Sequence, residues 1–233
     1  MIYNELAPYY DQLVADPQAT QKWVDFTCHQ IPSGRILELA CGSGEITFAL
    51  AEAGFTVDAL DLSSRMIEIA KRKFGDEQIH FHQTDMTAFN LNTKFDAVLC
   101  YCDSVNYLED DEAFLNMIKC VKCHLVPQGL FLFDMHTIQR LEEFQQQYIE
   151  EGDLDEVQYQ WTIQTYHNQL HHHFAFWFKT AFFEEFHVQT VHLPQHWIKL
   201  MQEAGFDVQC WTDFDKPEIQ SGEKILIAGR LRE

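Results

Sequence analysis

The chain has 233 residues, of which 46% are hydrophobic, so it is long enough to bury one sizeable core. Its 16 Lys and Arg against 36 Asp and Glu give a formal charge of -20, which repels phosphate backbones and anionic lipids and argues against a nucleic-acid partner. No window offers the roughly 18 apolar residues of a membrane helix and no export signal is visible, so we expect a cytoplasmic protein with no membrane contact.

The first half of the chain predicts a parallel α/β core. Residues 1–33 predict one or two helices, interrupted at Pro8 and Pro17. Residues 34–135 alternate short apolar runs with stretches of helical period, which is typical of right-handed strand–helix–strand units. The strands expected there are Arg35–Ala40, Thr56–Leu60, Ile79–Gln83, Phe95–Tyr101 and Gly129–Asp134.

The second half predicts an insertion and the completion of the sheet, within one single domain of residues 1–233. Residues 138–149 predict a polar helix, and the alternating, Phe-rich stretch of about 155–193 predicts two or three antiparallel strands. We expect this insertion, residues 138–193, to form a lid over a substrate or the interface of a homodimer. Residues 194–233 predict a helix and then strands near 206–214 and 224–231, which would complete the main sheet.

A glycine-rich loop follows the first strand of the core, in Ile36-Leu37-Glu38-Leu39-Ala40-Cys41-Gly42-Ser43-Gly44. Glycines let a ligand approach the backbone, and the helix that begins near Glu45 offers amide donors. A dinucleotide fingerprint needs a third glycine where Thr47 stands. Glu38 would repel a pyrophosphate but suits a cation such as the sulfonium of S-adenosylmethionine, directly or through water. The loop therefore favours S-adenosylmethionine over NAD.

Two further carboxylates follow at the ends of the next two strands. Asp61 comes 23 residues after Glu38 (61 minus 38) and can accept hydrogen bonds from both ribose hydroxyls. Asp85 can accept from an adenine amino group while Met86 packs on the ring. Open α/β sheets bind ligands at these strand ends. Taken singly, each feature also has a structural explanation, since Asp61 can cap a helix and Asp85 can form a turn.

Together these motifs resemble those of class I S-adenosylmethionine-dependent methyltransferases. The segment from Ile36 to Gly44 looks like the glycine-rich first motif, with Ala40 where the family often has glycine. The resemblance implies a Rossmann-like, doubly wound, mostly parallel sheet of seven strands whose last strand runs antiparallel, with S-adenosylhomocysteine as product. Tyr9 or Tyr10 resembles the tyrosine that small-molecule members place over the methionine end. The candidate cofactor-binding residues are Tyr9, Tyr10, Glu38, Ala40, Gly42, Gly44, Asp61, Leu62, Asp85, Met86 and Tyr101.

The acceptor chemistry is expected at the ends of the fourth and fifth strands. His136 has the pKa range to deprotonate a hydroxyl or amine, and Asp134 or Asp103 can orient it or bind a cationic acceptor. The loop after the fourth strand lacks the Asn/Asp-Pro-Pro-aromatic motif of methylases that act on nucleic-acid amino groups. We therefore predict in-line methyl transfer to an O, N or C centre of a small molecule.

Two alternatives remain open at this point, whereas a metal hypothesis does not. The alternatives are a non-catalytic S-adenosylmethionine-binding module and a NAD(P)-linked oxidoreductase. In the run from His171 to His173, neighbouring side chains of a strand point to opposite faces, so the three cannot share one ion and no metal site is expected.

Overall fold

The computed structural model describes residues 3, 6–75, 79–154 and 157–233. Its main sheet has the order β11-β10-β12-β5-β4-β1-β2-β3. The strands are β1 (Arg35–Leu39), β2 (Thr56–Asp61), β3 (Ile79–Gln83), β4 (Phe95–Cys100), β5 (Leu125–His136), β10 (Phe206–Thr212), β11 (Lys216–Pro217) and β12 (Lys224–Leu231). The strands β1 to β5 pair in parallel, and β12 runs antiparallel to both β5 and β10.

This sheet confirms the predicted Rossmann-like fold class and the five predicted core strands, of which β5 extends further at both ends. Over the described ranges the sheet has eight strands rather than the expected seven, because a two-residue strand, β11, pairs with β10 at the edge of the sheet. A strand of two residues carries no apolar periodicity, so the sequence could not reveal it.

Helices cover both faces of the sheet. The helices of the described residues are η1 (Ala7–Tyr9), α1 (Tyr10–Val14), α2 (Pro17–Gln30), α3 (Glu45–Glu52), α4 (Ser64–Phe74), η2 (Ser104–Tyr107), α5 (Asp111–His124), α6 (Ile138–Glu143) and α7 (Pro194–Glu203). Side-chain caps fix several starts: Asp16, Ser63 and Asp110 accept hydrogen bonds from backbone amides of the first turn. The helices α5 and α7 bury one face, where Phe114 and Trp197 stack 4.3 Å apart, and α2 and α3 bury the other.

The insertion forms a separate antiparallel sheet in the order β6-β7-β8-β9, with β6 (Tyr148–Leu154), β7 (Val157–Tyr166), β8 (Gln169–Trp177) and β9 (Phe182–Thr190). The antiparallel strands expected over about 155–193 are β7, β8 and β9, whereas the helix expected over 138–149 was wrong, because α6 ends at Glu143 and β6 follows. This edge strand is polar and mostly exposed, so it shows no apolar alternation. Pairing with β7 holds it, together with a 2.7 Å hydrogen bond from Tyr159 to Glu150.

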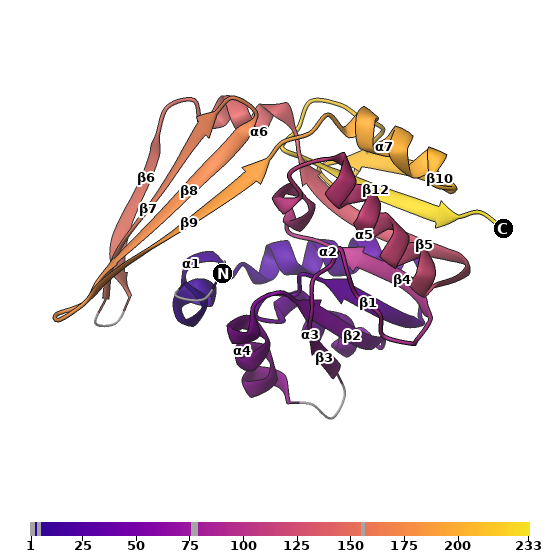
Figure 1. The fold of residues 1–233 in the computed structure, drawn as a ribbon, viewed down its shortest axis with the longest axis horizontal. Coiled ribbons are helices and arrows are strands. Elements are labelled where there is room, and N and C mark those ends of the chain that lie inside the picture. Colours follow the sequence, from indigo (N-terminus) through magenta and orange to yellow (C-terminus); the bar gives the residue numbers. More distant parts are fainter. Residues whose placement is uncertain (1–2, 4–5, 76–78, 155–156) are drawn as a thin grey trace.

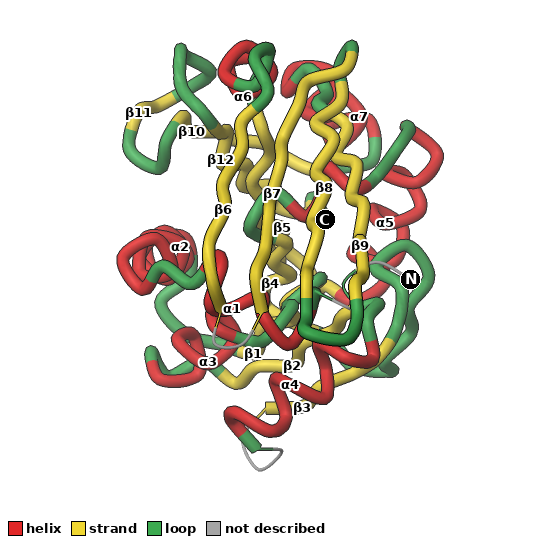
Figure 2. Tube along the Cα trace, turned by 90° about the vertical axis from the view of Figure 1, so that its left-hand side faces the viewer, coloured by secondary structure: helices red, strands yellow, loops and turns green. Residues whose placement is uncertain are grey.

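The insertion sheet stands over the edge of the main sheet at which the parallel strands end, and the short helix α1 lies between the two sheets (Figures 1 and 2). The chain enters the insertion through α6, directly after β5, and returns to the main sheet through α7. No described helix is long and apolar enough to cross a membrane. The fold therefore places an antiparallel wall opposite the strand ends at which such sheets bind ligands.

Candidate active site

A cavity of about 660 Å³ lies between the two sheets. Its walls come from the loop after β1, from α1 and α2, from the ends of β4 and β5, from α6 and from the inner face of β7, β8 and β9. Of the residues predicted from sequence, it is lined by Tyr10, Glu38, Ala40, Gly42, Asp61, Leu62, Asp85, Met86, Tyr101, Asp103 and His136. The structure thus brings most of the candidates to one site, from segments far apart in the chain.

Three candidates do not line this cavity. Tyr9 stacks on Phe176 of the insertion, with ring centroids 5.4 Å apart. Gly44 packs towards α4, where an added Cβ would lie 3.2 Å from the ring of Phe74. Asp134 is completely buried behind the cavity wall. The geometry gives these three structural roles, whereas Tyr10 stands in the cavity wall.

The loop after β1 has the backbone shape of a ligand cradle. Ala40, Gly42 and Gly44 all have left-handed φ values, of 53°, 54° and 86°. At Gly42 an added Cβ would meet no heavy atom within 4 Å, so open space lies beside its backbone. The loop leads directly into α3, whose first amide groups have no helical partner. These features fit a ligand held close to the backbone.

Asp61 ties this loop to the start of α4. Its Oδ2 accepts from the Gly42 amide and its Oδ1 from the Ser63 amide, both at 2.8 Å. Burial raises the pKa of Asp61, while these backbone hydrogen bonds oppose the shift. Each oxygen keeps a second lone pair that a hydroxyl can use.

Asp85 is exposed at the rim of the cavity and forms the turn that its sequence context suggested. Its Oδ1 accepts from the amide and the hydroxyl of Thr87, both at 2.7 Å. Because both bonds go to one oxygen, Oδ2 stays available to a ligand. The structural explanation and the adenine-binding prediction for Asp85 are therefore compatible.

Glu38 is a second buried carboxyl group of the site, beside Asp61, and it accepts a hydrogen bond from the hydroxyl of Thr47. This bond gives a reason for a threonine where a dinucleotide fingerprint has its third glycine. Burial raises the pKa of Glu38 to about 8, against the hydrogen bond from Thr47. A buried carboxyl group with a raised pKa fits a cationic ligand, because the cation would favour its charged form.

Trp23 adds a hydrogen-bond donor that is not among the site residues expected from the sequence. Its indole Nε1 is buried and has no hydrogen-bond partner among the described residues, and its side chain stands in the cavity wall. An unpaired buried N–H is costly, so a ligand oxygen at this point would relieve it. The Trp23 donor, the Gly42 cradle and the acidic Glu38 together fit S-adenosylmethionine, which carries a carboxylate and a sulfonium.

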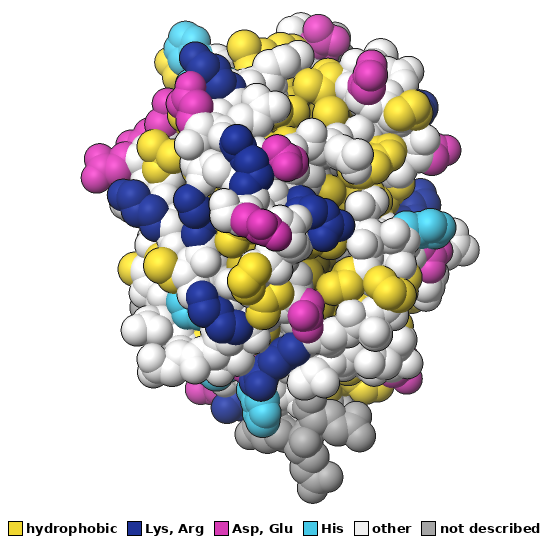
Figure 3. All heavy atoms as spheres, turned by 90° about the vertical axis from the view of Figure 1, so that its right-hand side faces the viewer, with side chains coloured by type: hydrophobic (Ala, Val, Ile, Leu, Met, Phe, Trp, Pro, Cys, Tyr) yellow, Lys and Arg dark blue, Asp and Glu magenta, His cyan; other side chains and the backbone are white. Residues whose placement is uncertain are grey.

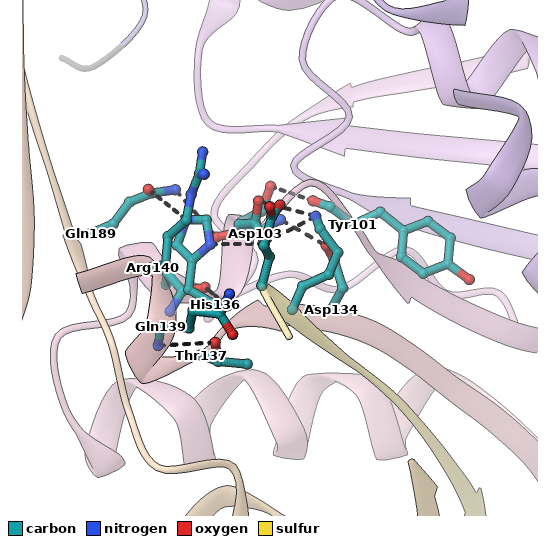
Figure 4. A network of polar contacts seen from close by, with 12 residues as sticks. Tyr101, Asp103, Asp134, His136, Thr137, Gln139, Arg140 and Gln189 are labelled. Atoms are coloured by element: carbon teal, nitrogen blue, oxygen red, sulfur yellow. Dashed lines mark hydrogen bonds and ion pairs between the residues drawn. The ribbon is translucent and has the colours of Figure 1, made fainter. Parts of the chain in front are cut away.

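A buried cluster of charges lies at the ends of β4 and β5 (Figure 4). Lys224, from β12, has its Nζ 2.8 Å from Asp134 Oδ2 and 3.3 Å from each Asp103 oxygen. The Nδ1 of His136 lies 3.3 Å from Asp103 Oδ1. Tyr101 stands apart, with its ring pointing away from the cluster and its hydroxyl 2.8 Å from the Thr27 hydroxyl.

Protonation in this cluster follows from burial and pairing. Burial alone would raise the pKa of Asp103, but the charges of His136 and Lys224 outweigh it and lower that pKa to about 2. Burial raises the pKa of Asp134 to about 6, although Lys224 opposes the shift. Burial lowers the pKa of His136 despite the neighbouring Asp103. At pH 7 Asp103 is therefore fully charged, Asp134 is also mostly charged, and His136 is neutral.

Aromatic side chains of the insertion form the opposite wall. The rings of Trp161 and Phe174 stack with centroids 5.1 Å apart and an interplanar angle of 22°. His172 lies beside Trp161, with its ring inclined by 28° and its centroid 6.0 Å away. Arg140 of α6 also lines the cavity, with its Cζ 4.7 Å from the centroid of the Phe144 ring. Such a wall can cover one face of a ring-shaped acceptor.

The fold and this site define a class I S-adenosylmethionine-dependent methyltransferase, and the chain belongs to this family. A family model described as a methyltransferase domain matches residues 36–129. Over nearly the whole length, the chain is 34% identical to "Putative methyltransferase YqeM" of Bacillus subtilis (strain 168), covering 97% of this chain and 96% of that protein. The prediction of a methyltransferase is thus confirmed, and both alternatives are dropped.

Solved structures agree with this assignment. A S-adenosylmethionine-dependent methyltransferase from Clostridium acetobutylicum ATCC 824 superposes with a TM-score of 0.82 at 26% identity, over 99% of both chains. The sugar N-methyltransferase KedS8 from Streptoalloteichus sp ATCC 53650 has a TM-score of 0.80 at 22% identity, over 100% of this chain and 94% of its own. The second likeness concerns the fold alone. The protein is an enzyme that uses S-adenosylmethionine.

Proposed function

We propose that this enzyme methylates an amino nitrogen of a small molecule bound between the two sheets. The observation that carries the proposal is the charge of the cavity. Among the described residues, nine carboxyl groups line it, one of which, Glu38, has a pKa raised to about 8, against one cationic side chain, Arg140. Such a wall attracts an ammonium group and repels phosphates. Asp103, charged and with 17% of its side chain exposed, would receive the ammonium, and His136 is neutral and can take up its proton.

The residues of the cofactor half have binding roles in this proposal. Asp61 would hold the ribose, Asp85 and Met86 the adenine, Gly42 the methionine end, and Glu38 the sulfonium side. When bound, S-adenosylmethionine supplies a methyl group already activated on sulfur, so the protein has mainly to align the acceptor and exclude water.

The acceptor body would lie against the aromatic wall of Trp161 and Phe174, with the insertion as its lid. Two relatives support nitrogen as the methylated atom. The chain is 30% identical over 106 residues, 46% of its length, to dTDP-3-amino-3,6-dideoxy-alpha-D-glucopyranose N,N-dimethyltransferase of Streptomyces fradiae. KedS8, named a sugar N-methyltransferase, shares the fold over the entire chain.

Nucleic acid is a poor partner for this protein, and we propose none. The chain carries a net charge of -20. On the face opposite the insertion, Lys and Arg side chains are scattered among acidic and apolar ones rather than gathered (Figure 3). We also propose a cytoplasmic location, which the seven free thiols support.

A homodimer through the insertion is proposed from its outer face. Trp177, Phe182, Phe186 and Val188 are 41%, 50%, 63% and 40% exposed there. Such an apolar strip is unusual on a monomer. Sedimentation of the wild type and of Phe186→Glu tests the proposal: a monomeric wild type would refute it.

The methylation proposal is tested with labelled S-adenosylmethionine and a panel of small cyclic amines, alcohols, phenols and carbon acids, with products identified by mass spectrometry. We expect turnover of amines, and loss of most of it in Asp103→Asn while S-adenosylhomocysteine still binds. Turnover confined to alcohols, phenols or carbon acids would refute nitrogen as the acceptor.

A further inference from the structure

A chain of side-chain hydrogen bonds runs from the insertion to His136, and it begins at Trp161. The indole Nε1, which can only donate, lies 3.3 Å from Nδ1 of His172. His172 therefore accepts at Nδ1. Burial and the neighbouring His187 lower the pKa of His172 to about 4, so the ring is neutral and carries its one proton on Nε2.

Gln189 of β9 connects the His172 ring to the buried cluster of charges that contains Asp103 and His136. Its Oε1 lies 3.2 Å from Nε2 of His172, which has to donate to it. Its Nε2 faces the backbone oxygen of Asp103 at 3.5 Å, which fits the same orientation of the amide. The oxygen end of Gln189 is therefore turned towards the imidazoles rather than the amino end.

The same oxygen lies 3.1 Å from Nε2 of His136, as the contacts beside Gln189 in Figure 4 show. His136 must then also carry its proton on Nε2, and its Nδ1 lone pair points to Asp103 Oδ1, 3.3 Å away. We propose that Gln189 is a positioning residue that fixes this tautomer of His136, so that Nδ1 and the Asp103 carboxylate together form a vacant site for one proton of the acceptor amine. This inference rests on the proposed N-methylation.

The proton step balances without a further reactant. An N–H bond of the acceptor ammonium breaks, and its electron pair stays on nitrogen, where it can form the new bond to carbon. The proton passes through Oδ1 of Asp103, which is more exposed than His136, to the lone pair of Nδ1. The resulting imidazolium is stabilised by the Asp103 carboxylate, which remains charged.

The charged groups around His136 come from several elements, and some raise the pKa of the ring while others lower it. Asp103 favours the imidazolium, whereas Lys224 of β12 and Arg140 of α6 disfavour it, as does burial. Asp134 of β5 binds Lys224 at 2.8 Å, and the neutral His172 of β8 faces the same amide oxygen. The ring is thus neutral before the proton arrives.

Ring-nitrogen NMR with isotope-labelled histidine tests the tautomers without any acceptor, with signals assigned from His136→Asn and His172→Asn. We expect both rings as Nε2–H forms at pH 7. In Gln189→Leu and in the milder Trp161→Phe, His136 should gain the Nδ1–H form, because Nδ1 can then donate to Asp103. An unchanged His136 tautomer in both variants would overturn the proposal.

Activity gives the second readout. Gln189→Leu should lower kcat about tenfold or more, with an unchanged Kd for S-adenosylhomocysteine. Gln189→Glu should shift the acidic limb of the pH profile of kcat/KM to higher pH, because an added carboxylate raises the pKa of His136. The control is Gln169→Leu, a glutamine of β8 that contacts Thr190 and His171 and does not line the cavity. A Gln189→Glu profile that coincides with wild type would contradict a positioning role. If NMR finds the predicted tautomers but the enzyme methylates no amine, the proposed function is refuted and the positioning role of Gln189 is not.

Discussion

Binding of S-adenosylmethionine should release a proton from Glu38, whereas binding of S-adenosylhomocysteine should not. With its pKa raised to about 8, Glu38 is about 10% ionised at pH 7 and about 1% ionised at pH 6. A sulfonium beside Glu38 selects the ionised form, and the neutral sulfur of the product does not. Between pH 6 and pH 7 the affinity for the cofactor should therefore rise about tenfold relative to that for the product.

Titration calorimetry in buffers of different ionisation enthalpy measures this directly. We expect about 0.9 protons released per cofactor bound at pH 7, the fraction of Glu38 that is protonated beforehand. The matched control is Glu38→Gln, which keeps the hydrogen bond to Thr47 but cannot ionise. It should abolish the difference between the two ligands. Equal proton release with both ligands in the wild type would refute the reasoning.

Three further changes have expected outcomes of their own. Asp61→Ala should raise the Kd of S-adenosylhomocysteine about tenfold or more, and an unchanged calorimetric Kd would reject the ribose assignment. Lys224→Met leaves Asp103 and Asp134 without their buried cation, so the free energy of unfolding should fall by about 3 to 5 kcal/mol. Because removal of Lys224 raises both carboxyl pKa values, urea denaturation should find a larger loss at pH 8 than at pH 5.5, and an equal loss would be contrary evidence. Trp161→Ala should raise KM for the amine several-fold while the cofactor Kd stays constant; the reverse pattern would exclude stacking on the acceptor.

The parts of the fold that could be predicted from the sequence depend on local rules. The apolar runs of β1 and β2 and the capping side chains Ser63 and Asp110 act within a few residues of their own position. The glycine-rich loop is local too, since its left-handed φ values are needed wherever the chain lies. Strand β6 was missed because its stability comes from pairing with β7 rather than from an apolar face.

The parts of the site that were not predicted depend on distant contacts. Lys224 meets Asp103 across 121 residues of chain, and nothing near Lys224 distinguishes it from a surface lysine. Gln189 meets His136 across 53 residues, and its role depends on the orientation of an amide. Conversely, the sequence suggested that Asp134 could face a ligand, but its side chain is completely buried and paired with Lys224. The cofactor half could be predicted from local motifs, whereas in the acceptor half the sequence indicated Asp103 and His136 but not their distant partners Lys224 and Gln189.

The most direct measurement is a crystal structure with S-adenosylhomocysteine and an amine that the enzyme methylates. We predict the nucleoside in the cavity with its ribose on Asp61, and the amino nitrogen within hydrogen-bond distance of Asp103, between the product sulfur and the wall formed by Trp161. An amine bound outside this cavity, or one whose nitrogen lies away from Asp103 and His136, would contradict the proposed active site.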